Sequence, residues 1–320
     1  MKLLIIGGAG YIGGVTTHLA HDAGHQVTVA DNLSSGHREN IPDGVTFIEG
    51  DIREKAFVDR LFADTTYDVI IHFAAKILVA ESMEQPYEYY QNNTVATLEI
   101  VDAAVKAGCK NYIISSTAAT YGEPTHTPVS ESDPTLPVNP YGFSKLMSEQ
   151  LLRSYELTHG LHWCALRYFN VAGAYDGVGP AYPFIAHIIP MLLDNLEKNQ
   201  PITINGTDYD TPDGSCIRDY VHVHDIARAH LLAADVLLNE TINQPINLGS
   251  SNGYSVKQVI ETFQQVTGKR LDVVTGPRRP GDPAQLIASN QRAKELLSWE
   301  PTHSLEDIIR DHYDWYVSKL

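Results

Sequence analysis

A glycine-rich loop at residues 7–13 constrains the fold of this chain more than any other feature. The loop reads G-G-A-G-Y-I-G, follows a short apolar run at Lys2–Ile6 and opens a helical stretch at Tyr11–Ala23. Glycines at positions 7, 10 and 13 allow a tight turn, a close approach of a ligand to the backbone, and close helix–sheet contact. A loop of this kind between a strand and a helix is typical of the first turn of a doubly wound α/β fold.

Short apolar runs rich in Val and Ile recur through the first half of the chain and alternate with helical stretches. Their continuous hydrophobicity predicts strands buried on both faces, as in a parallel sheet covered by helices. The predicted strands are Lys2–Ile6, Gln26–Ala30, Val45–Ile48, Asp68–His72, Asn111–Ser115 and Trp163–Arg167. The predicted helices are Tyr11–Ala23, Glu54–Ala63, Tyr87–Ala107 and Tyr141–Thr158. This order predicts an α/β fold with a doubly wound (Rossmann) parallel sheet, whose ligand lies at the carboxyl ends of the strands.

The regular alternation ends after about residue 167, where loops rich in Gly and Pro become frequent. We expect a first domain at residues 1–168 and a smaller, mixed α/β domain at residues 169–320, with a helix at Ala186–Lys198. The apolar segment Pro245–Gly249 predicts one more buried strand. We therefore expect part of residues 220–249 to rejoin the first sheet, so that the two domains interleave.

The net charge of the chain limits the classes of partner that it can bind. The 320 residues include 23 Lys and Arg and 39 Asp and Glu, which gives a net charge of −16. A surface this acidic repels nucleic acid phosphates and anionic lipids, so neither nucleic acid nor a membrane is an expected partner. Three cysteines are too few for a disulfide framework, which predicts a reducing, cytoplasmic location. No metal site is expected, because His222 and His224 form only a pair that more often caps or packs.

The residues after the first strands predict the cofactor. Asp31 follows the second strand, about 20 residues after the loop, where a carboxylate accepts hydrogen bonds from a ribose diol and repels a 2′-phosphate. We therefore expect NAD rather than NADP. Asp51 and Ile52 follow the third strand and are expected near the adenine, although an Asp at this position is also a common helix cap. The full set expected from the loop and these strands is Gly7, Gly10, Tyr11, Ile12, Gly13, Asp31, Asn32, Asp51 and Ile52.

A Y-x-x-x-K motif at residues 141–145 predicts the catalytic group. Tyr141 and Lys145 share one face of a helix that Asn139 and Pro140 begin, and Thr117 ends the preceding strand. A tyrosine that acts as a base at pH 7 must have its pKa lowered by ~3 units, or roughly 4 kcal/mol, and a lysine charge can supply part of this. We expect Tyr141 to remove a proton from an alcohol that Thr117 holds, while a hydride leaves for NAD.

Taken together, these motifs resemble the extended short-chain dehydrogenase/reductase family. The segments G-x-x-G-x-x-G, S-S-T-x-x-x-Y-G, Y-G-x-S-K and R-Y-F-N carry the resemblance, which runs from residue 1 to about 318. More narrowly, the chain is similar to the UDP-hexose 4-epimerases of that family. The resemblance implies that Thr117, Tyr141 and Lys145 are catalytic. It implies further cofactor contacts from Phe73, Ala74, Ala75, Asn92, Lys145 and Tyr168.

The resemblance also implies a UDP-sugar site in the second domain, formed by Asn170, Arg218, Tyr220, Arg279, Asp282 and Leu286, together with Thr117 and Tyr141. Two arginines can bind a diphosphate through paired hydrogen bonds, which agrees with this assignment. Leu286 stands where a large residue restricts the sugar pocket and a small one admits N-acetyl sugars. One departure is that Ile77 replaces the usual lysine and Lys76 stands one position earlier.

The residues after Thr117 narrow the range of reactions that we expect the chain to catalyse. Dehydratases of this kind carry an acid and a base there, whereas this chain has Ala118 and Ala119. We therefore expect epimerisation between UDP-galactose and UDP-glucose through a 4-keto sugar with tightly bound NAD. The alternatives are a UDP-N-acetylglucosamine or dual-substrate 4-epimerase, another sugar-nucleotide enzyme such as a uronate epimerase or a reductase, and a non-catalytic NAD sensor. The resemblance implies a homodimer formed through Tyr87–Ala107 and Tyr141–Thr158.

Overall fold

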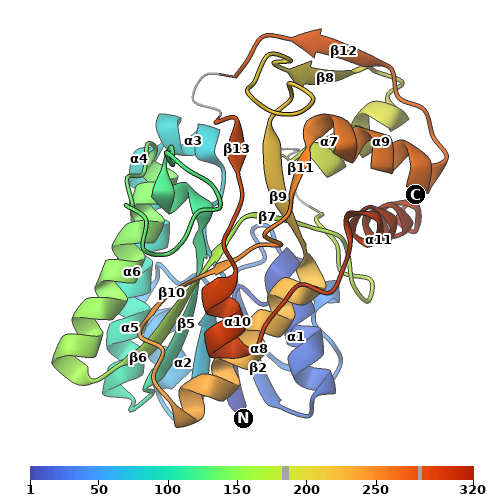
Figure 1. Ribbon diagram of the computed structural model, residues 1–320. Coiled ribbons are helices and arrows are strands. Elements are labelled where there is room, and N and C mark those ends of the chain that lie inside the picture. The colour runs from blue at the N-terminus through green and yellow to red at the C-terminus, as the bar shows by residue number, and fades with distance from the viewer. Residues whose placement is uncertain (182–186, 280–282) are drawn as a thin grey trace.

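The computed structural model describes residues 1–181, 187–279 and 283–320, and its centre is a seven-stranded parallel sheet (Figure 1). The strand order is β10-β6-β5-β4-β1-β2-β3, and each neighbouring pair is parallel. The strands are β1 (Lys2–Ile6), β2 (Gln26–Asp31), β3 (Thr46–Glu49), β4 (Val69–His72), β5 (Asn111–Thr117), β6 (His162–Tyr168) and β10 (Gln244–Leu248). The predicted doubly wound α/β fold is confirmed.

Helices cover both faces of this sheet, which explains why the central residues of β1 and β4 are apolar on both faces. One face packs against α1 (Tyr11–Asp22), α8 (Val223–Asn239) and α10 (Gln291–Leu297), and the other against α2 (Lys55–Phe62), α5 (Ala96–Lys106) and α6 (Pro140–His159). Successive residues of β1 alternate between the two cores. Leu3 and Ile5 lie in the core on the α8 side, and Leu4 and Ile6 lie in the core on the α5 side.

The helical region that leads to α5 differs from the prediction. A single helix is predicted at Tyr87–Ala107, but the chain forms α3 (Val79–Glu84), α4 (Pro86–Tyr89), a π-helical turn η2 (Tyr90–Val95) and then α5. The widened turn carries Asn93, whose buried side chain bonds the Lys76 backbone and the Ser144 hydroxyl. A tertiary contact of this kind leaves no trace in the helical spacing of the sequence, so the sequence predicts the helical region but not the π-helical turn within it.

The part of the chain after β6 also contains two short sheets. The first joins β7 (Asn170–Ala172), β9 (Ile217–His222), β11 (Gly253–Ser255) and β13 (Gln285–Leu286), and the second pairs β8 (Ile202–Asn205) with β12 (Val273–Gly276). Three helices share a core with these strands: α7 (Ile188–Glu197), α9 (Val256–Thr267) and α11 (Leu305–Val317). The proposed division between residues 168 and 169 falls at the end of β6.

The chain passes between the two parts several times (Figure 1). Strand β9 of the second part continues directly into α8, which packs on the large sheet, and β10 then pairs with β6 at the edge of that sheet. Helix α10 also returns to pack on α8 and β10. Two single 3-10 turns complete the described elements, η1 (Arg38–Asn40) and η3 (Ala118–Tyr121). In the described ranges, none of the helices has the length and hydrophobicity that crossing a bilayer requires.

Candidate active site

A cavity of about 680 Å³ opens at the carboxyl ends of the large sheet, where the strand order reverses between β1 and β4. Residues of both parts of the chain line it. From the predicted set, the lining includes Gly7, Gly10, Tyr11, Ile12, Gly13, Asp31, Asn32, Ile52, Phe73, Ala74, Ala75, Asn92, Thr117, Tyr141, Lys145, Tyr168, Asn170, Arg218 and Leu286. The reversal point of a doubly wound sheet is where such folds bind nucleotides.

The glycine loop forms the floor of this cavity. Gly7 has a φ of 81°, and a Cβ atom there would lie 2.5 Å from the backbone nitrogen of Ala74. A Cβ atom on Gly13 would lie 2.1 Å from the carbonyl oxygen of Gly7. Both positions therefore exclude any side chain. The loop leads into the N-terminus of the twelve-residue helix α1, whose amide groups favour a negatively charged ligand. These residues fit the pyrophosphate of a dinucleotide.

Asp31 ends β2 at the rim of the cavity. Its Oδ2 accepts a hydrogen bond from the Ala9 amide at 3.0 Å, and its Oδ1 accepts one from the Leu33 amide at 2.8 Å. Burial raises the pKa of Asp31, and these backbone bonds act in the opposite direction. The carboxylate is thus held in place beside the loop. This placement fits a ribose diol and disfavours a 2′-phosphate.

Asp51 is differently placed from the other predicted cofactor residues. It is absent from the cavity lining, while its neighbours Ile52 and Arg53 are part of it. The Arg53 guanidinium bonds the Asp51 carboxylate at 2.7 Å and lowers its pKa to about 2, and the Asn32 amide donates to the same carboxylate at 3.2 Å. The Arg53 backbone amide also bonds Asp51 at 2.9 Å. The Asp51 carboxylate thus closes a turn onto Arg53 and pairs with its guanidinium, whereas the N-cap position of α2 is Glu54. Arg53 is a cavity cation that the sequence did not predict.

Helix α6 brings Tyr141 and Lys145 to Thr117. The helix begins as predicted, because the Asn139 side chain accepts a hydrogen bond from the Gly142 amide at 2.8 Å and Pro140 takes the first helical position. Thr117 is the last residue of β5, and its hydroxyl accepts a hydrogen bond from the Ala119 amide at 3.2 Å. Burial raises the pKa of Tyr141, and a hydrogen bond with the Thr117 side chain acts in the opposite direction.

Lys145 is 4% exposed, and its Nζ donates a hydrogen bond to the Ser115 hydroxyl at 3.1 Å. Burial lowers the pKa of Lys145 to about 7, and the charge of Glu149 opposes this shift. The predicted triad is thus gathered in one cavity, with the buried Lys145 ammonium one helical turn from the half-buried Tyr141 phenol. Ser115 and Glu149 complete this environment, and their roles were not predicted.

The remaining residues of the cofactor side lie around the same cavity. The Tyr168 hydroxyl bonds His230 Nε2 at 2.5 Å, and the Phe73 ring lies 4.5 Å from the His230 ring, measured between centroids. Lys76, the displaced lysine, lines the cavity and forms an ion pair with Glu81 at 3.1 Å. The Glu81 carboxylate also accepts a hydrogen bond from the Tyr89 hydroxyl at 2.8 Å.

The predicted substrate residues divide between two adjoining cavities. Arg218 and Leu286 are register partners on β9 and β13, so they enter the large cavity side by side. Tyr220 and Arg279 line a second cavity of about 170 Å³ that shares Asn170 and Arg218 with the first. Two arginines around one cavity fit a diphosphate. Asp282, the remaining predicted residue, lies outside the described residues.

Buried Asp219 holds this side of the cavity together, although the sequence reasoning gave it no role. Its carboxylate accepts hydrogen bonds from the Ser250 amide at 2.7 Å and from the Ala288 amide at 3.0 Å. Burial raises its pKa to about 6, against the effect of these bonds. The Asn170 side chain donates to the Asp219 carbonyl at 2.9 Å. Asp219 therefore fixes β9 relative to β13, and with it the positions of Arg218 and Leu286.

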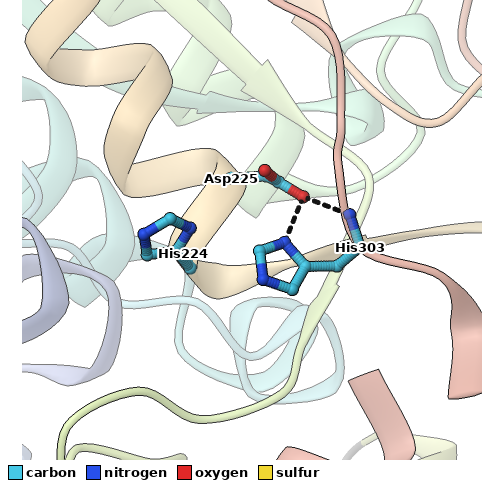
Figure 2. A group of neighbouring side chains, drawn as sticks. All are labelled: His224, Asp225 and His303. Carbon is cyan, nitrogen blue, oxygen red and sulfur yellow. Dashed lines mark hydrogen bonds and ion pairs between the residues drawn. The ribbon is translucent and has the colours of Figure 1, made fainter. Parts of the chain in front are cut away.

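A cluster of His224, Asp225 and His303 lies at the start of α8 (Figure 2). Asp225 is fully buried, and both of its carboxylate oxygens accept hydrogen bonds from protein donors. The donors are the Thr302 amide at 2.9 Å, the Thr302 hydroxyl at 2.7 Å, the His303 amide at 3.1 Å, His303 Nδ1 at 2.9 Å and Arg228 at 3.2 Å. His222 caps α8, because its Nδ1 accepts from the His224 amide at 3.0 Å. The cluster therefore ties the loop before α11 to α8, and its carboxylate is committed to that contact.

Comparisons with known proteins agree with this geometry. The profile of the NAD dependent epimerase/dehydratase family matches residues 3–249. The UDP-glucose 4-epimerase of Halalkalibacterium halodurans is 45% identical over 320 residues, covering 99% of this chain and 96% of that protein. The solved UDP-glucose 4-epimerase of Brucella ovis in complex with NAD is 38% identical, with a TM-score of 0.93 and coverage of 98% and 97%. The corresponding enzyme of Bifidobacterium longum, solved with NAD+ and UDP, is 33% identical, with a TM-score of 0.92 and coverage of 99% and 98%.

The family confirms NAD as the cofactor expected from the sequence, and the cavity around the glycine loop and Asp31 fits it. Cofactor, fold and motifs thus lead to one assignment: this chain is an enzyme of the NAD dependent epimerase/dehydratase family.

Proposed function

We propose that the enzyme interconverts UDP-galactose and UDP-glucose by inverting the configuration at C4 of the hexose, the activity named UDP-glucose 4-epimerase. The observation that carries the proposal is the composition of one cavity. It joins the glycine loop, the Thr117–Tyr141–Lys145 group and the Arg218 side of the second domain. The relatives named above carry the name of this activity, which supports the proposal.

The two residues that follow Thr117 narrow the reaction to one carbon of the sugar. Ala118 and Ala119 follow Thr117 and line the cavity, and neither side chain can transfer a proton. Elimination of water from the sugar would need such groups close to Thr117. Oxidation at C4 followed by reduction on the opposite face needs a single group that first takes and then returns one proton.

Tyr141 performs that proton transfer. Its phenolate removes the proton of the C4 hydroxyl, the Thr117 hydroxyl holds this hydroxyl in line, and the charge of Lys145 stabilises the phenolate. Bound NAD would supply the hydride acceptor for the oxidation and the hydride donor for the reduction. Tyr141 then returns its proton to the C4 oxygen. Because the redox change cancels over one cycle, the residues of the glycine loop are expected to retain the same NAD through many turnovers.

Arg218 and Arg279 anchor the diphosphate while the 4-keto sugar turns over. Both guanidinium groups lie at the cavity that adjoins the catalytic one, and the Asn205 amide, oriented with its oxygen toward Arg279, accepts from it at 3.1 and 3.3 Å. A fixed diphosphate leaves the hexose free to present either face to the same catalytic residues. Asn170 and Tyr220 are proposed contacts on the same side, and the cofactor contacts proposed above keep their assignments.

The test uses the purified enzyme, UDP-galactose and no added NAD. Chromatography should detect conversion toward a fixed ratio of UDP-glucose to UDP-galactose, and UDP-N-acetylgalactosamine is assayed in parallel. Tyr141→Phe should abolish conversion and still retain NAD, measured after release from denatured protein. Tyr155→Phe removes the same atom from the same helix outside the cavity and serves as the matched control. Near-normal turnover in Tyr141→Phe would refute the assignment.

We also propose that the enzyme is a cytoplasmic homodimer. The three cysteines are buried, and the structure describes no disulfide between them, which suits a reducing compartment. The region of α3 to α6 exposes several large apolar side chains, among them Met83, Tyr87, Val95, Phe143, Met147 and Leu157. A surface of this kind favours pairing with a second copy. Light scattering should give the mass of a dimer, and Met147→Glu should give a monomer.

A further inference from the structure

A buried ion pair lies beside the catalytic lysine. Glu149 and Arg167 are 2% and 3% exposed, and two hydrogen bonds join them, Nε to Oε1 at 2.9 Å and NH2 to Oε2 at 2.6 Å. The Ser116 hydroxyl donates to Glu149 Oε1 at 2.5 Å. On its other side, Arg167 NH1 donates to the Tyr121 hydroxyl at 2.8 Å. The pair is therefore fully bonded and rigidly held between α6 and β6.

Stability alone does not explain this pair. Removing two charges from water costs more than a surface pair gains, and apolar residues of similar volume are often equally stabilising. The position of the pair suggests another role. Glu149 follows Lys145 by four residues on α6, so both side chains lie on the same helix face, and Ser115 and Ser116 of β5 bond Lys145 and Glu149 respectively.

The other charged or titratable groups around Lys145 do not favour a positive charge. His72 on β4 is fully buried, and burial together with the charge of Lys145 lowers its pKa to about 3, so it remains neutral. Burial raises the pKa values of the Tyr141 and Tyr168 phenols. Arg167 is itself a cation. The charge of Glu149 is what opposes the effect of burial on the pKa of Lys145.

We propose that Glu149 is a positioning residue for the reaction: its carboxylate, fixed by Arg167 and Ser116, keeps the buried Lys145 positively charged, so that Lys145 can stabilise the Tyr141 phenolate. The proposal rests on the proposed function. Glu149 does not touch the substrate in this role and acts through Lys145. Arg167 supplies the counter-charge of this buried carboxylate, and its NH1 donates to the Tyr121 hydroxyl.

The test needs a variant that folds. Glu149→Gln alone leaves Arg167 buried without its counter-charge and is expected to destabilise the protein. The double variant Glu149→Gln with Arg167→Met removes both charges and keeps a group that can accept from Ser116. Tyr121→Phe is the matched control, because it perturbs the same network and leaves the Glu149 charge in place.

Two readouts distinguish a charge effect from a structural one. The first is the ultraviolet absorbance of the Tyr141 phenolate during a pH titration of the NAD-containing enzyme, obtained as the difference from the same protein carrying Tyr141→Phe. The second is the dependence of kcat on pH with UDP-galactose. In the double variant we expect the apparent pKa of Tyr141 to rise by about one unit, so that kcat at pH 7 falls about tenfold and recovers at higher pH, with KM little changed.

An unchanged phenolate titration in the folded double variant would overturn the proposal. So would a loss of kcat that is equal at every pH, or the same shift in Tyr121→Phe. The phenolate titration does not depend on turnover. If the wild-type enzyme fails to convert UDP-galactose, the proposed function fails, and the titration still decides whether Glu149 controls the charge beside Tyr141.

Discussion

Replacing Lys145 by Met removes the charge next to the proposed base and leaves the packing largely intact. The lysine side chain is 4% exposed, so methionine, which has a similar shape and needs no solvation, should fill the same space. The one hydrogen bond lost in the described structure is that to the Ser115 hydroxyl. The variant should fold. Because Lys145 is also an expected cofactor contact, bound NAD is quantified in the variant and kcat is expressed per bound NAD, so that the remaining loss of activity reports on the chemistry.

The size of the expected loss follows from the pKa of the phenol. A free tyrosine titrates near 10, so a phenolate at pH 7 requires about 3 pKa units of stabilisation, or roughly 4 kcal/mol. Burial raises the pKa of Tyr141 and so increases this requirement. If Lys145 supplies between half and all of it, Lys145→Met should lower kcat at pH 7 by about 30-fold to about 1000-fold.

The assay measures initial rates with UDP-galactose from about pH 6 to about pH 10. Without the lysine charge, log kcat should rise by about one unit per pH unit across this range, because the fraction of phenolate rises with pH. The matched control is Lys76→Met, which removes a cavity lysine that pairs with Glu81 and should keep the wild-type dependence on pH. A loss in Lys145→Met that is equal at every pH would refute the reasoning, and so would undiminished activity at pH 7.

Three further predictions concern the cofactor, the fold and the substrate. Asp31→Asn should weaken NAD retention by about 10-fold to 100-fold, because it removes a charged acceptor of ribose hydroxyls. The same change should relax the exclusion of NADP. Both effects can be tested by quantifying the NAD and NADP released from purified protein. Asp225→Asn should lower the free energy of unfolding by about 2–4 kcal/mol, measured by denaturant titration, since the oxygens that bond Thr302 and His303 are fully buried. Burial raises the pKa of Asp225, but the hydrogen bonds from Thr302 and His303 outweigh this effect and lower the pKa below its ordinary value. In the wild type, the contribution of Asp225 to the free energy of unfolding is therefore present above the unfolded-state pKa near 4 and is lost as the pH falls through the folded-state pKa. A variant whose stability falls with acid as steeply as that of the wild type would contradict this. Leu286→Tyr should suppress turnover of UDP-N-acetylgalactosamine and spare UDP-galactose, judged by the ratio of the two kcat/KM values, whereas an equal loss on both would remove Leu286 from the specificity pocket.

The parts of the fold that could be predicted are those that local sequence determines. Strand β1 has its predicted bounds, Lys2–Ile6, because Leu3–Ile6 are buried between helices on both faces of the sheet and form a continuous apolar run. The glycines at positions 7 and 13 stand where a Cβ atom would meet backbone. Asn139 caps α6 through its own side chain. In each case the residue type and its nearest neighbours in sequence contain the physical cause, so spacing is sufficient to find it.

The features that could not be predicted depend on contacts between distant segments. The π-helical turn at Tyr90–Val95 accompanies the bonds of Asn93 to Lys76 and Ser144, which come from other elements. The Glu149–Arg167 pair joins a helix to the next strand. Arg167 opens the R-Y-F-N segment, but nothing in that segment identifies Glu149 as its partner. A polar residue that will be buried is indistinguishable, in the sequence alone, from one that faces solvent. Its partner becomes visible only when the fold brings the two elements together.

The interleaving of the two parts has a consequence for how the proposed reaction proceeds. Arg218 on β9 and the residues of α8 belong to one continuous element, since α8 begins directly after β9, and α8 packs on the sheet that carries Thr117. Asp225 ties the second part to the start of α8, and the Tyr11 hydroxyl in the cofactor cavity donates to the Gly173 carbonyl at 2.7 Å. The proposed diphosphate anchor and the proposed catalytic group are therefore linked by covalent bonds and by several buried contacts. A 4-keto sugar that must present its second face cannot rely on a relative movement of these walls, so under the proposed function the rotation belongs to the substrate, about the bonds between its anchored diphosphate and the hexose.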